Sequence, residues 1–382
     1  MRCRRSSSAA LLAAWTLAGT AHALSLPDRF VDPEDGNLDA SQYLLDHRGA
    51  LPVPIIITEP AVGYGGGLAL AWFSESIREA AEAAKGGRIT PPNIYAGAAF
   101  GTENGTKGAF AGARMAFDED RWRYRAAALA TSVNLDFYGI GGDLAQGLSK
   151  VGYNLKGAGV FQELTRRIGE SDHFVGLRYL YLDIATRLSV DAQDANLTPR
   201  ELGSRSSELG ARWVYDSRDN IFTTTRGIEA AVDAMFSDPA IGSDNTFRTY
   251  RAHAFAYGKP AESFVLAGRV DGRTARGDVP FYQLPFIDMR GIPAARYQDE
   301  STGVIEVEGR YYATPRWIVV GFAGAGRAWG RDTSFGDAGT KTTRGVGIRY
   351  MLARRLGLAV GIDVARGPEK TAFYLQVGNA WR

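Results

Sequence analysis

The sequence has almost no cysteine, few histidines and no long apolar segment. Of its 382 residues, one is cysteine (Cys3) and four are histidine. Cys3 lies in an N-terminal segment that we expect to be removed, so the remaining chain has no thiol for a disulfide, a metal site or a nucleophile. The sequence therefore predicts neither a disulfide-stabilised fold nor a cysteine enzyme.

An excess of one charge is also missing. The chain has 44 basic and 42 acidic residues, and without residues 1–23 these become 41 and 42, a net charge of about −1. This balance gives no electrostatic reason to expect a nucleic-acid partner. His47, His173 and His253 show no spacing typical of a metal site or catalytic triad, and no Gly-x-Ser-x-Gly turn occurs. We therefore predict no enzymatic activity, no metal and no cofactor.

The first 23 residues have the pattern of a secretory signal peptide. MRCRRSSSAALLAAWTLAGTAHA combines a basic start, an apolar run over residues 9–18 and a small-x-small site at residues 21–23. The apolar run falls short of the roughly 20 residues that a spanning helix needs. We expect residues 1–23 to be removed and the chain to be exported.

One pattern of alternating side chains recurs along the chain. In LGLAVGIDVAR, residues 356–366, leucine, valine and isoleucine occupy every second position, and the others are small or charged. The same alternation appears in residues 227–236, 264–274 and 304–312. Strict alternation over such lengths predicts β-strands with two chemically different faces.

Two architectures fit this alternation, a secreted β-sandwich and a transmembrane barrel. Strands of about 10 residues, second faces that mix both charges with glycine and alanine, aromatic residues near strand ends and 46 glycines favour the barrel. The prediction is an all-β transmembrane antiparallel barrel in the outer membrane of a Gram-negative bacterium, in contact with membrane lipids and lipopolysaccharide. The secreted sandwich remains the alternative.

The alternating segments predict sixteen strands, an even number as in bacterial barrels. Short and long connections alternate, which places the short ones in the periplasm. Residues 74–92 break this scheme and are rich enough in alanine and glutamate to form a short helix. Residues 24–52 are predicted as a short periplasmic segment and residues 53–382 as the barrel. The strands are predicted near residues 53–58, 61–73, 93–101, 107–117, 121–134, 152–166, 172–188, 206–216, 226–236, 246–258, 262–274, 303–313, 316–329, 343–352, 355–366 and 371–381.

Three motifs resemble the bacterial surface antigen family, the barrel of BamA/TamA-type outer-membrane assembly factors. WVYDSRDNIFTTTRG (213–227) resembles the turn YDxRDNxFxPxRG, DFYGIGG (136–142) resembles FYGxGN, and MRGIPAARY (289–297) resembles the loop-six signature VRGF or VRGY. The resemblance extends over residues 55–382. The matching positions of the predicted periplasmic turn are Asp216, Arg218, Asp219, Asn220, Arg226 and Gly227.

The resemblance implies a barrel that helps proteins or lipids enter or cross the outer membrane. Partners implied in this way are client outer-membrane proteins and separate periplasmic factors. Relatives carry periplasmic POTRA domains, whereas residues 24–52 leave no room for a domain of the usual 50 residues or more. A passive pore or structural barrel without assembly activity is the alternative.

The resemblance also assigns a role to Arg290 and Gly291 of the loop-six signature. In the family this loop folds into the barrel and its arginine docks on acidic groups of the inner wall. The matching acidic residue is Glu308, and Glu306 lies on the same strand face. The family often has a second acid where this chain has Gly324. We therefore expect Arg290 to rest on Glu308 and Glu306; a solvated Arg290 on an outer loop is the alternative.

The last segment, TAFYLQVGNAWR (371–382), resembles the C-terminal signal of outer-membrane barrels, with Phe373 on its apolar face and Trp381 near its end. We expect the seam between the first and last strands to be rich in glycine through Gly65, Gly66 and Gly378, and weakly specified. Such a seam could open for a client strand. Alternatively, these glycines only allow the barrel to curve.

Overall fold

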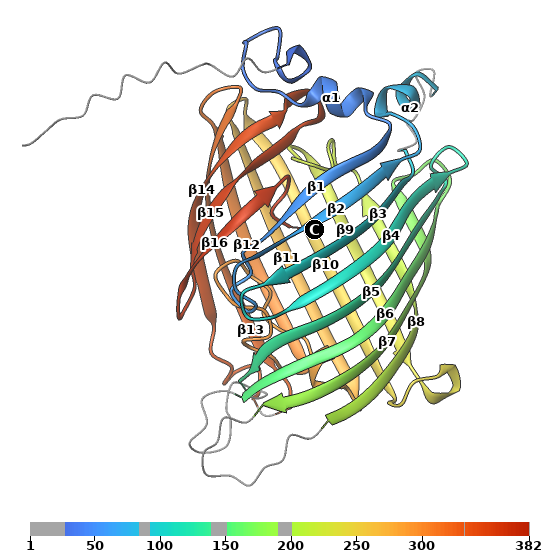
Figure 1. Ribbon diagram of the computed structural model, residues 1–382. Helices are drawn as coiled ribbons and strands as arrows, with labels where there is room; N and C mark the ends of the chain where they lie inside the picture. Colours follow the sequence, from blue (N-terminus) through green and yellow to red (C-terminus); the bar gives the residue numbers. More distant parts are fainter. Residues whose placement is uncertain (1–26, 84–91, 139–150, 190–200, 332, 382) are drawn as a thin grey trace, which may run out of the picture.

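A computed structural model describes residues 27–83, 92–138, 151–189, 201–331 and 333–381, so the predicted signal peptide lies outside the described residues. The described residues form one sheet of sixteen antiparallel strands, each paired with its neighbours in the chain. The sheet curves into a barrel (Figure 1). The strands are β1 Gly49–Ile57, β2 Gly65–Phe73, β3 Ile94–Thr102, β4 Lys107–Phe117, β5 Trp122–Phe137, β6 Val151–Arg167, β7 His173–Ser189, β8 Glu201–Asp216, β9 Gly227–Ser237, β10 Phe247–Ala261, β11 Phe264–Gly277, β12 Ser301–Tyr312, β13 Trp317–Trp329, β14 Lys341–Ala353, β15 Leu358–Arg366 and β16 Thr371–Val377.

The predicted number and order of strands are confirmed, and the secreted-sandwich alternative is wrong. Several strands differ from their predicted bounds, the two terminal strands among them. β1 begins at Gly49, so residues 49–52 belong to the barrel and not to the N-terminal segment. The sequence pattern did not predict this start because of Pro52 and Pro54. Proline interrupts a strand pattern and is tolerated mainly on edge strands. β16 ends at Val377, four residues before the predicted end.

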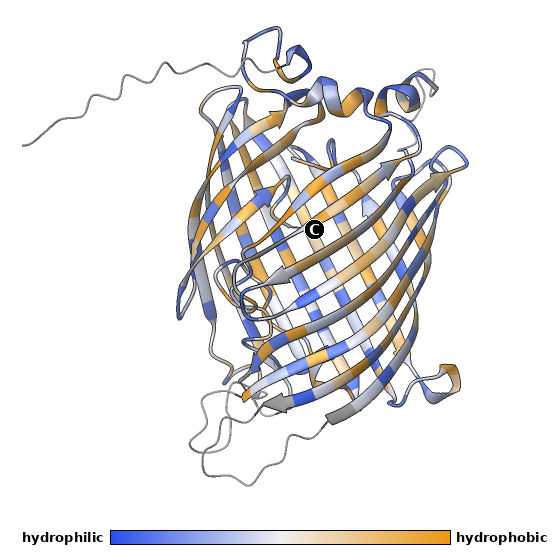
Figure 2. Cartoon of the chain, viewed as in Figure 1, coloured by the Kyte–Doolittle hydropathy of each residue, from blue (hydrophilic) through white to orange (hydrophobic). Residues whose placement is uncertain are grey.

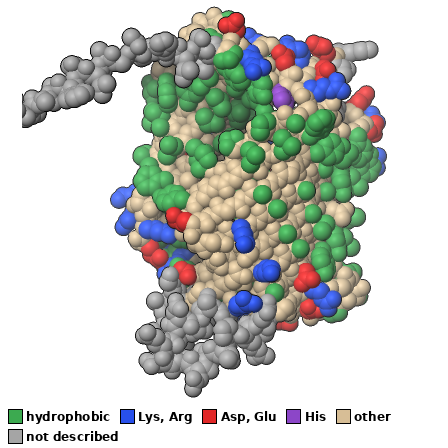
Figure 3. Space-filling model, viewed as in Figure 1, with side chains coloured by type: hydrophobic (Ala, Val, Ile, Leu, Met, Phe, Trp, Pro, Cys, Tyr) green, Lys and Arg blue, Asp and Glu red, His purple; other side chains and the backbone are tan. Residues whose placement is uncertain are grey.

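The two faces of the sheet have the chemistry of a transmembrane wall. Apolar side chains such as Leu177 (62% exposed) and Val346 (64% exposed) point outward. Charged side chains such as Asp233 and Glu308 point inward and are buried. Figure 2 shows this alternation along the strands, and in Figure 3 hydrophobic side chains lie over the wall between two rims where most charges gather. The outer face therefore suits lipid contact.

The strand connections define two different ends of the barrel. At one end lie the short helices α1, Ser41–Asp46, and α2, Ile77–Ala83, together with the shorter turns (Figure 1). We call this the α1 end and the opposite one the long-loop end. The helix predicted within residues 74–92 is α2. No helix among the described residues is long and apolar enough to cross a membrane.

Candidate functional site: the lumen loop and the barrel seam

The connection between β11 and β12, residues 278–300, folds back into the barrel. We call it loop six. Its residues Ile287, Met289 and Ile292 pack with Val304 of β12 in a buried apolar cluster. The loop is therefore anchored to the inner wall by side chains that would be exposed if it projected outward.

Arg290 lies at the centre of this buried loop. Its Nη1 is 2.8 Å from Glu308 Oε2 on β12 and 2.7 Å from Asp363 Oδ2 on β15. The guanidinium carbon lies 3.5 Å from the ring centroid of Phe322 on β13, a cation–π arrangement. Two carboxylates and a ring thus replace water around the charge, which a buried guanidinium requires.

The predicted contact of Arg290 with Glu306 is absent, since Glu306 is occupied elsewhere. Its Oε2 accepts a hydrogen bond from Nη1 of Arg269 at 2.8 Å. Gly324, where relatives often carry the second acid, leaves space for loop six. A Cβ there would lie 2.6 Å from the Glu306 side chain and 3.0 Å from the sulfur of Met289. A side chain at this position would collide with the docked loop.

Asp363 supplies the second carboxylate instead. Asp363 and Glu308 both also contact Arg349, at 3.1 and 3.3 Å, and Glu308 contacts Arg310 at 2.7 Å. These four wall side chains have no exposed surface. Three guanidiniums, Arg290 included, therefore share two carboxylates, and loss of either acid would leave a buried charge without its partner.

The backbone conformation at position 291 explains why a glycine follows Arg290. Its φ is +93°, a conformation that favours glycine. A Cβ there would lie 2.9 Å from the backbone nitrogen of Gly367. The Gly291 amide donates to the hydroxyl of Tyr374 on β16 at 2.8 Å. The Arg290–Gly291 pair therefore joins loop six to the last two strands.

The seam between β1 and β16 has no backbone pairing among the described residues. β1 pairs with β2, and β16 with β15, but not with each other. Pro52 and Pro54 occupy alternate positions of β1, so their missing N–H groups lie on one edge. Proline in a strand is tolerated where its nitrogen faces away from the ladder. We infer that β1 turns an edge with two fewer donors toward β16.

The glycines predicted to line this seam lie elsewhere. Gly65 and Gly66 belong to β2, where they pair with β1 and β3. Gly378 has a φ of +74° and follows the end of β16, and a Cβ there would lie 2.5 Å from the Phe222 carbonyl oxygen. Phe373 faces outward with 49% of its surface exposed, as predicted for a membrane-facing position. The seam is unpaired because of its edges, not because of these glycines.

After Gly378 the chain turns into the barrel. The Asn379 Oδ1 accepts from the Thr224 amide at 3.1 Å. Trp381 is buried, with its ring centroid 6.1 Å from that of Phe255 and 6.4 Å from that of Tyr257, both on β10. Trp381 is therefore packed inside the lumen and not at the lipid-facing end of β16, because β16 ends before it.

The predicted turn between β8 and β9 is held by its own polar residues. The Arg218 Nε donates to Asp216 Oδ1 at 2.8 Å. Asp219 Oδ1 accepts from the amide of Arg226 at 3.2 Å, and hydrogen bonds to the turn lower its pKa despite the opposing effect of burial. Gly227 has a φ of +104° and packs against the turn backbone. These residues fix the turn where the chain re-enters the wall.

Asn220 connects this turn to the last strands. Its Oδ1 accepts from the amide of Phe222 at 2.7 Å, and its Nδ2 donates to the Leu356 carbonyl oxygen at 2.8 Å. Gly357, with a φ of +66°, approaches Asn220 so closely that a Cβ would lie 2.8 Å from Nδ2. The turn thus connects the middle of the barrel to β15 next to the seam.

At the long-loop end, side chains and loop six cross the seam. The Ala294 amide of loop six donates to Glu59 Oε1, in the β1–β2 connection, at 3.0 Å. Burial raises the pKa of Glu59, although the amide hydrogen bond opposes this. Lys370, between β15 and β16, donates to the Pro60 carbonyl oxygen at 3.2 Å. Loop six therefore contacts both sides of the seam.

The sequence of this barrel matches a known family model over residues 105–288, described as the Omp85 superfamily domain. The match covers just under half of the chain, so residues 105–288 resemble this superfamily. A comparison with curated proteins finds no match. The matched residues run from the start of β4 to loop six and include the β8–β9 turn.

The fold of the barrel is also found in solved structures. BamA from Haemophilus ducreyi lacking POTRA domains 1–3 superposes with a TM-score of 0.58 at 11% identity, covering 87% of this chain and 70% of that chain. CdiB from Acinetobacter baumannii (TM-score 0.52, 12% identity) covers 85% of this chain and 59% of its own. CdiB from Escherichia coli has a TM-score of 0.52 at 11% identity, covering 85% of this chain and 61% of that chain. At these identities the likeness concerns the fold.

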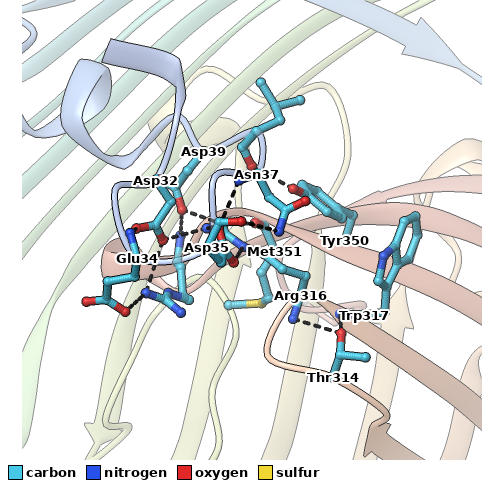
Figure 4. Close-up of polar contacts among 12 residues, drawn as sticks. Asp32, Glu34, Asp35, Asn37, Asp39, Thr314, Arg316, Trp317, Tyr350 and Met351 are labelled. Carbon is cyan, nitrogen blue, oxygen red and sulfur yellow. Dashed lines mark hydrogen bonds and ion pairs between the residues drawn. The ribbon is translucent and has the colours of Figure 1, made fainter. Parts of the chain in front are cut away.

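At the α1 end of the barrel, the N-terminal residues clasp the turn between β12 and β13. Arg316 contacts three carboxylates, those of Asp32, Asp35 and Asp39, with Nε 2.7 Å from Asp35 Oδ2 (Figure 4). The Tyr350 hydroxyl of β14 donates to the Leu38 carbonyl oxygen at 2.7 Å. We call residues 28–40 with Arg316 the N-terminal clasp.

Charge holds this clasp together. The hydrogen bond from Arg316 holds the pKa of Asp35 well below its usual range and raises that of Arg316 itself. Burial acts to raise the pKa of Asp39, but hydrogen bonds from Ser41 and Arg316 outweigh it and lower the pKa. The clasp is therefore ionised at neutral pH.

The clasp also bridges the seam from the α1 end. Residues 28–40 contact the β12–β13 turn, β14 and the β14–β15 connection, and the chain continues through α1 into β1 on the other side. Asp46 of α1 pairs with Arg78 of α2, in the β2–β3 connection, at 2.5 Å. The N-terminal segment thus connects the two edges of the sheet without backbone pairing between β1 and β16.

Sequence reasoning missed two functional candidates, Asp363 and Arg316. Asp363 is the one charged residue on the small-residue face of LGLAVGIDVAR, a signal for an inward polar contact. Asp32, Asp35 and Asp39 lie in the acidic segment DPEDGNLD, residues 32–39, and nothing in the sequence pairs this segment with Arg316. Among the described residues no cluster of histidine, cysteine or acidic side chains suits a metal. Residues 139–142 of the DFYGIGG motif lie outside the described residues.

Proposed function

We propose that this chain assists the insertion or translocation of proteins, or of lipids, at the outer membrane of a Gram-negative bacterium. In this proposal the α1 end faces the periplasm and the seam between β1 and β16 opens toward lipid. The observation that carries it is the unpaired seam, since every other neighbouring pair of strands is hydrogen-bonded. The resemblance of residues 105–288 to the Omp85 superfamily supports it.

An unpaired strand edge in lipid costs free energy and favours pairing with another strand. Backbone groups at membrane depth lack water partners, so an added strand would satisfy them. Pro52 and Pro54 make the β1 edge a poor template because two donors are missing. β16, Thr371–Val377, contains no proline and is therefore the better edge for a client strand.

Loop six is proposed to link the lumen to the seam. Arg290 holds the loop on β12 and β15, while Gly291 contacts Tyr374 on one side of the seam and Ala294 contacts Glu59 on the other. Separation of β1 from β16 would break one of the last two contacts. Release of Arg290 and opening of the seam should therefore be coupled.

The test is a reversible lock across the seam. The chain without its signal peptide contains no cysteine, so an introduced pair is unique. Pro60→Cys with Lys370→Cys, joined by a cleavable bismaleimide linker, would tie the β1–β2 and β15–β16 connections. The matched control is Arg205→Cys with Asp244→Cys, whose native side chains pair at 3.0 Å away from the seam.

The measurement is the folding rate of an unfolded outer-membrane protein added to vesicles that contain the barrel, followed by heat-modifiable gel mobility. We expect the unmodified barrel to accelerate folding, the seam lock to abolish the acceleration, cleavage to restore it, and the control lock to leave it intact. Equal client folding with and without the barrel, together with steady solute flux, would support the passive pore instead.

A further inference from the structure

A large cavity lies inside the barrel near its α1 end. It has a volume of about 880 Å³ and lies between the walls of β4–β10, the β8–β9 turn and the C-terminal residues. Seven arginines line it, against three acidic side chains. We call it the vestibule. It belongs neither to loop six nor to the N-terminal clasp.

The positive charge faces the cavity, whereas the compensating carboxylates lie behind it. The Arg125 side chain is 47% exposed to the lumen, but that of its partner Glu163 is only 3% exposed. Arg123 and its partner Asp120 differ in the same way, at 26% and 2%. Glu163 is moreover shared with Arg178, 2.7 Å away. A ligand in the vestibule would therefore meet guanidinium groups.

Arg114 adds an uncompensated charge to this wall. It lies directly opposite Arg125 in the β4–β5 ladder, and both side chains line the vestibule. Like charges directly opposite each other destabilise a strand pair. Within the part of the chain that the structure describes, Arg114 has no hydrogen bond or ion pair, while Arg123 and Arg125 have acids of their own. An anion between these side chains would relieve the repulsion.

Part of the vestibule rim is apolar. This apolar rim includes Phe222 of the β8–β9 turn and Trp381, which follows β16. A ligand in the cavity would thus contact both arginines and apolar side chains. This division distinguishes the vestibule from a uniformly charged, solvated lumen.

We propose that the vestibule binds a phosphate group carried on an amphiphile, with Arg114, Arg123 and Arg125 on the phosphate and the apolar rim on the acyl portion. Guanidinium groups form paired, charge-assisted hydrogen bonds to phosphate oxygens, and more than one donor can share the same phosphate. The proposal does not depend on seam opening, because it concerns binding to the closed barrel.

The test uses the full chain in a neutral maltoside detergent and isothermal titration calorimetry. The probes are inorganic phosphate and soluble dihexanoyl phosphatidic acid, which distinguish a free anion from a lipid headgroup. Arg114→Gln removes the unpaired charge, and Arg114→Lys retains it. Arg248→Gln is the control, since Arg248 is exposed on the outer face of β10. Heat-modifiable mobility verifies that each variant is folded.

Saturable binding of phosphatidic acid is expected, tighter than that of inorganic phosphate because of the apolar rim. Loss of one charge-assisted contact should weaken it about tenfold or more in Arg114→Gln. Arg114→Lys should retain most of the affinity and Arg248→Gln all of it. Equal affinity for both probes would overturn the proposal that the ligand is an amphiphile. Equal binding by Arg114→Gln and Arg248→Gln, or binding of an acidic peptide but of neither probe, would overturn the site.

Discussion

Arg290 and Asp363 are 73 residues apart in the chain, and their Nη1 and Oδ2 atoms are 2.7 Å apart inside the barrel. The first lies in a long connection and the second in the middle of β15. Their contact, together with Glu308, fixes loop six against three strands. Asp363 on β15 supplies the second carboxylate for Arg290. An acidic residue on β13, at position 324, is therefore not needed.

Asp363→Asn should release loop six. Removing one partner of a buried ion pair typically costs about 3–5 kcal/mol, and here Arg290 and Arg349 both lose a carboxylate. In planar bilayers this variant should show frequent large conductance steps. Glu306→Gln is the matched control, because Glu306 pairs with Arg269 and not with Arg290. Similar records for both variants would contradict a lock built on Asp363.

Replacing Pro52 and Pro54 by valine should seal the seam. Two restored N–H groups would let β1 form a ladder with β16, and β-branched residues favour strands. The double variant should unfold at a higher temperature in heat-modifiable gels and accelerate client folding less than the parent. Pro60→Val, in the β1–β2 connection, serves as the control. A double variant as active and as heat-labile as the parent would argue against the proline edge.

The N-terminal clasp should lose stability in acid but not in mild alkali. The pKa values of Asp35 and Asp39 are lowered in the folded chain, so their stabilisation is fully present above the ordinary aspartate value of about 4 and is lost as pH falls below it. Because the pKa of Arg316 is raised, its charge and its contribution to stability persist until far above neutral pH. Limited proteolysis of residues 28–40 should accelerate only in strong acid.

Arg316→Gln provides the pH-independent counterpart of that experiment. It removes the cation shared by three carboxylates, so residues 28–40 should be cleaved quickly at neutral pH as well. Arg355→Gln is the control, because the backbone of Arg355, not its side chain, contacts Ser41. If Arg316→Gln is as resistant as Arg355→Gln at neutral pH, the segment is held by other contacts.

Trp381 and Phe373 should behave differently when each is replaced by alanine. Trp381 is packed on Phe255 and Tyr257, so its truncation should cost about 3–5 kcal/mol and lower the unfolding temperature. Phe373 faces outward, so its truncation should leave that temperature nearly unchanged while slowing assembly in cells. Equal loss of thermal stability in both variants would contradict the lumenal position of Trp381.

The barrel could be predicted from the sequence because each strand carries its own signal. In β15, every apolar residue of the alternating pattern faces outward and Asp363 faces inward, as period-two patterning requires. Pairing between chain neighbours then follows from short connections. The failures occur where this local signal ends, at the prolines of β1 and at Gly378, which turns the chain inward.

The partners within the site could be predicted only in part. Glu308 follows from the family motif, but Asp363 depends on how the sheet curves back on itself, which no local pattern encodes. Arg316 contacts carboxylates 277 to 284 residues earlier in the chain, and only the closed shape of the barrel brings them together. Gly324 looked like a missing acid, yet it provides room for Met289.

The distance in sequence between the two halves of the N-terminal clasp has a consequence for maturation. Pairing between consecutive strands is local and can proceed stepwise, whereas the contact between Asp35 and Arg316 spans 281 residues. It cannot form until the intervening strands have taken their places. Capture of Arg316 by the leading residues would therefore mark a finished molecule, and their resistance to protease would report the last event of its biogenesis.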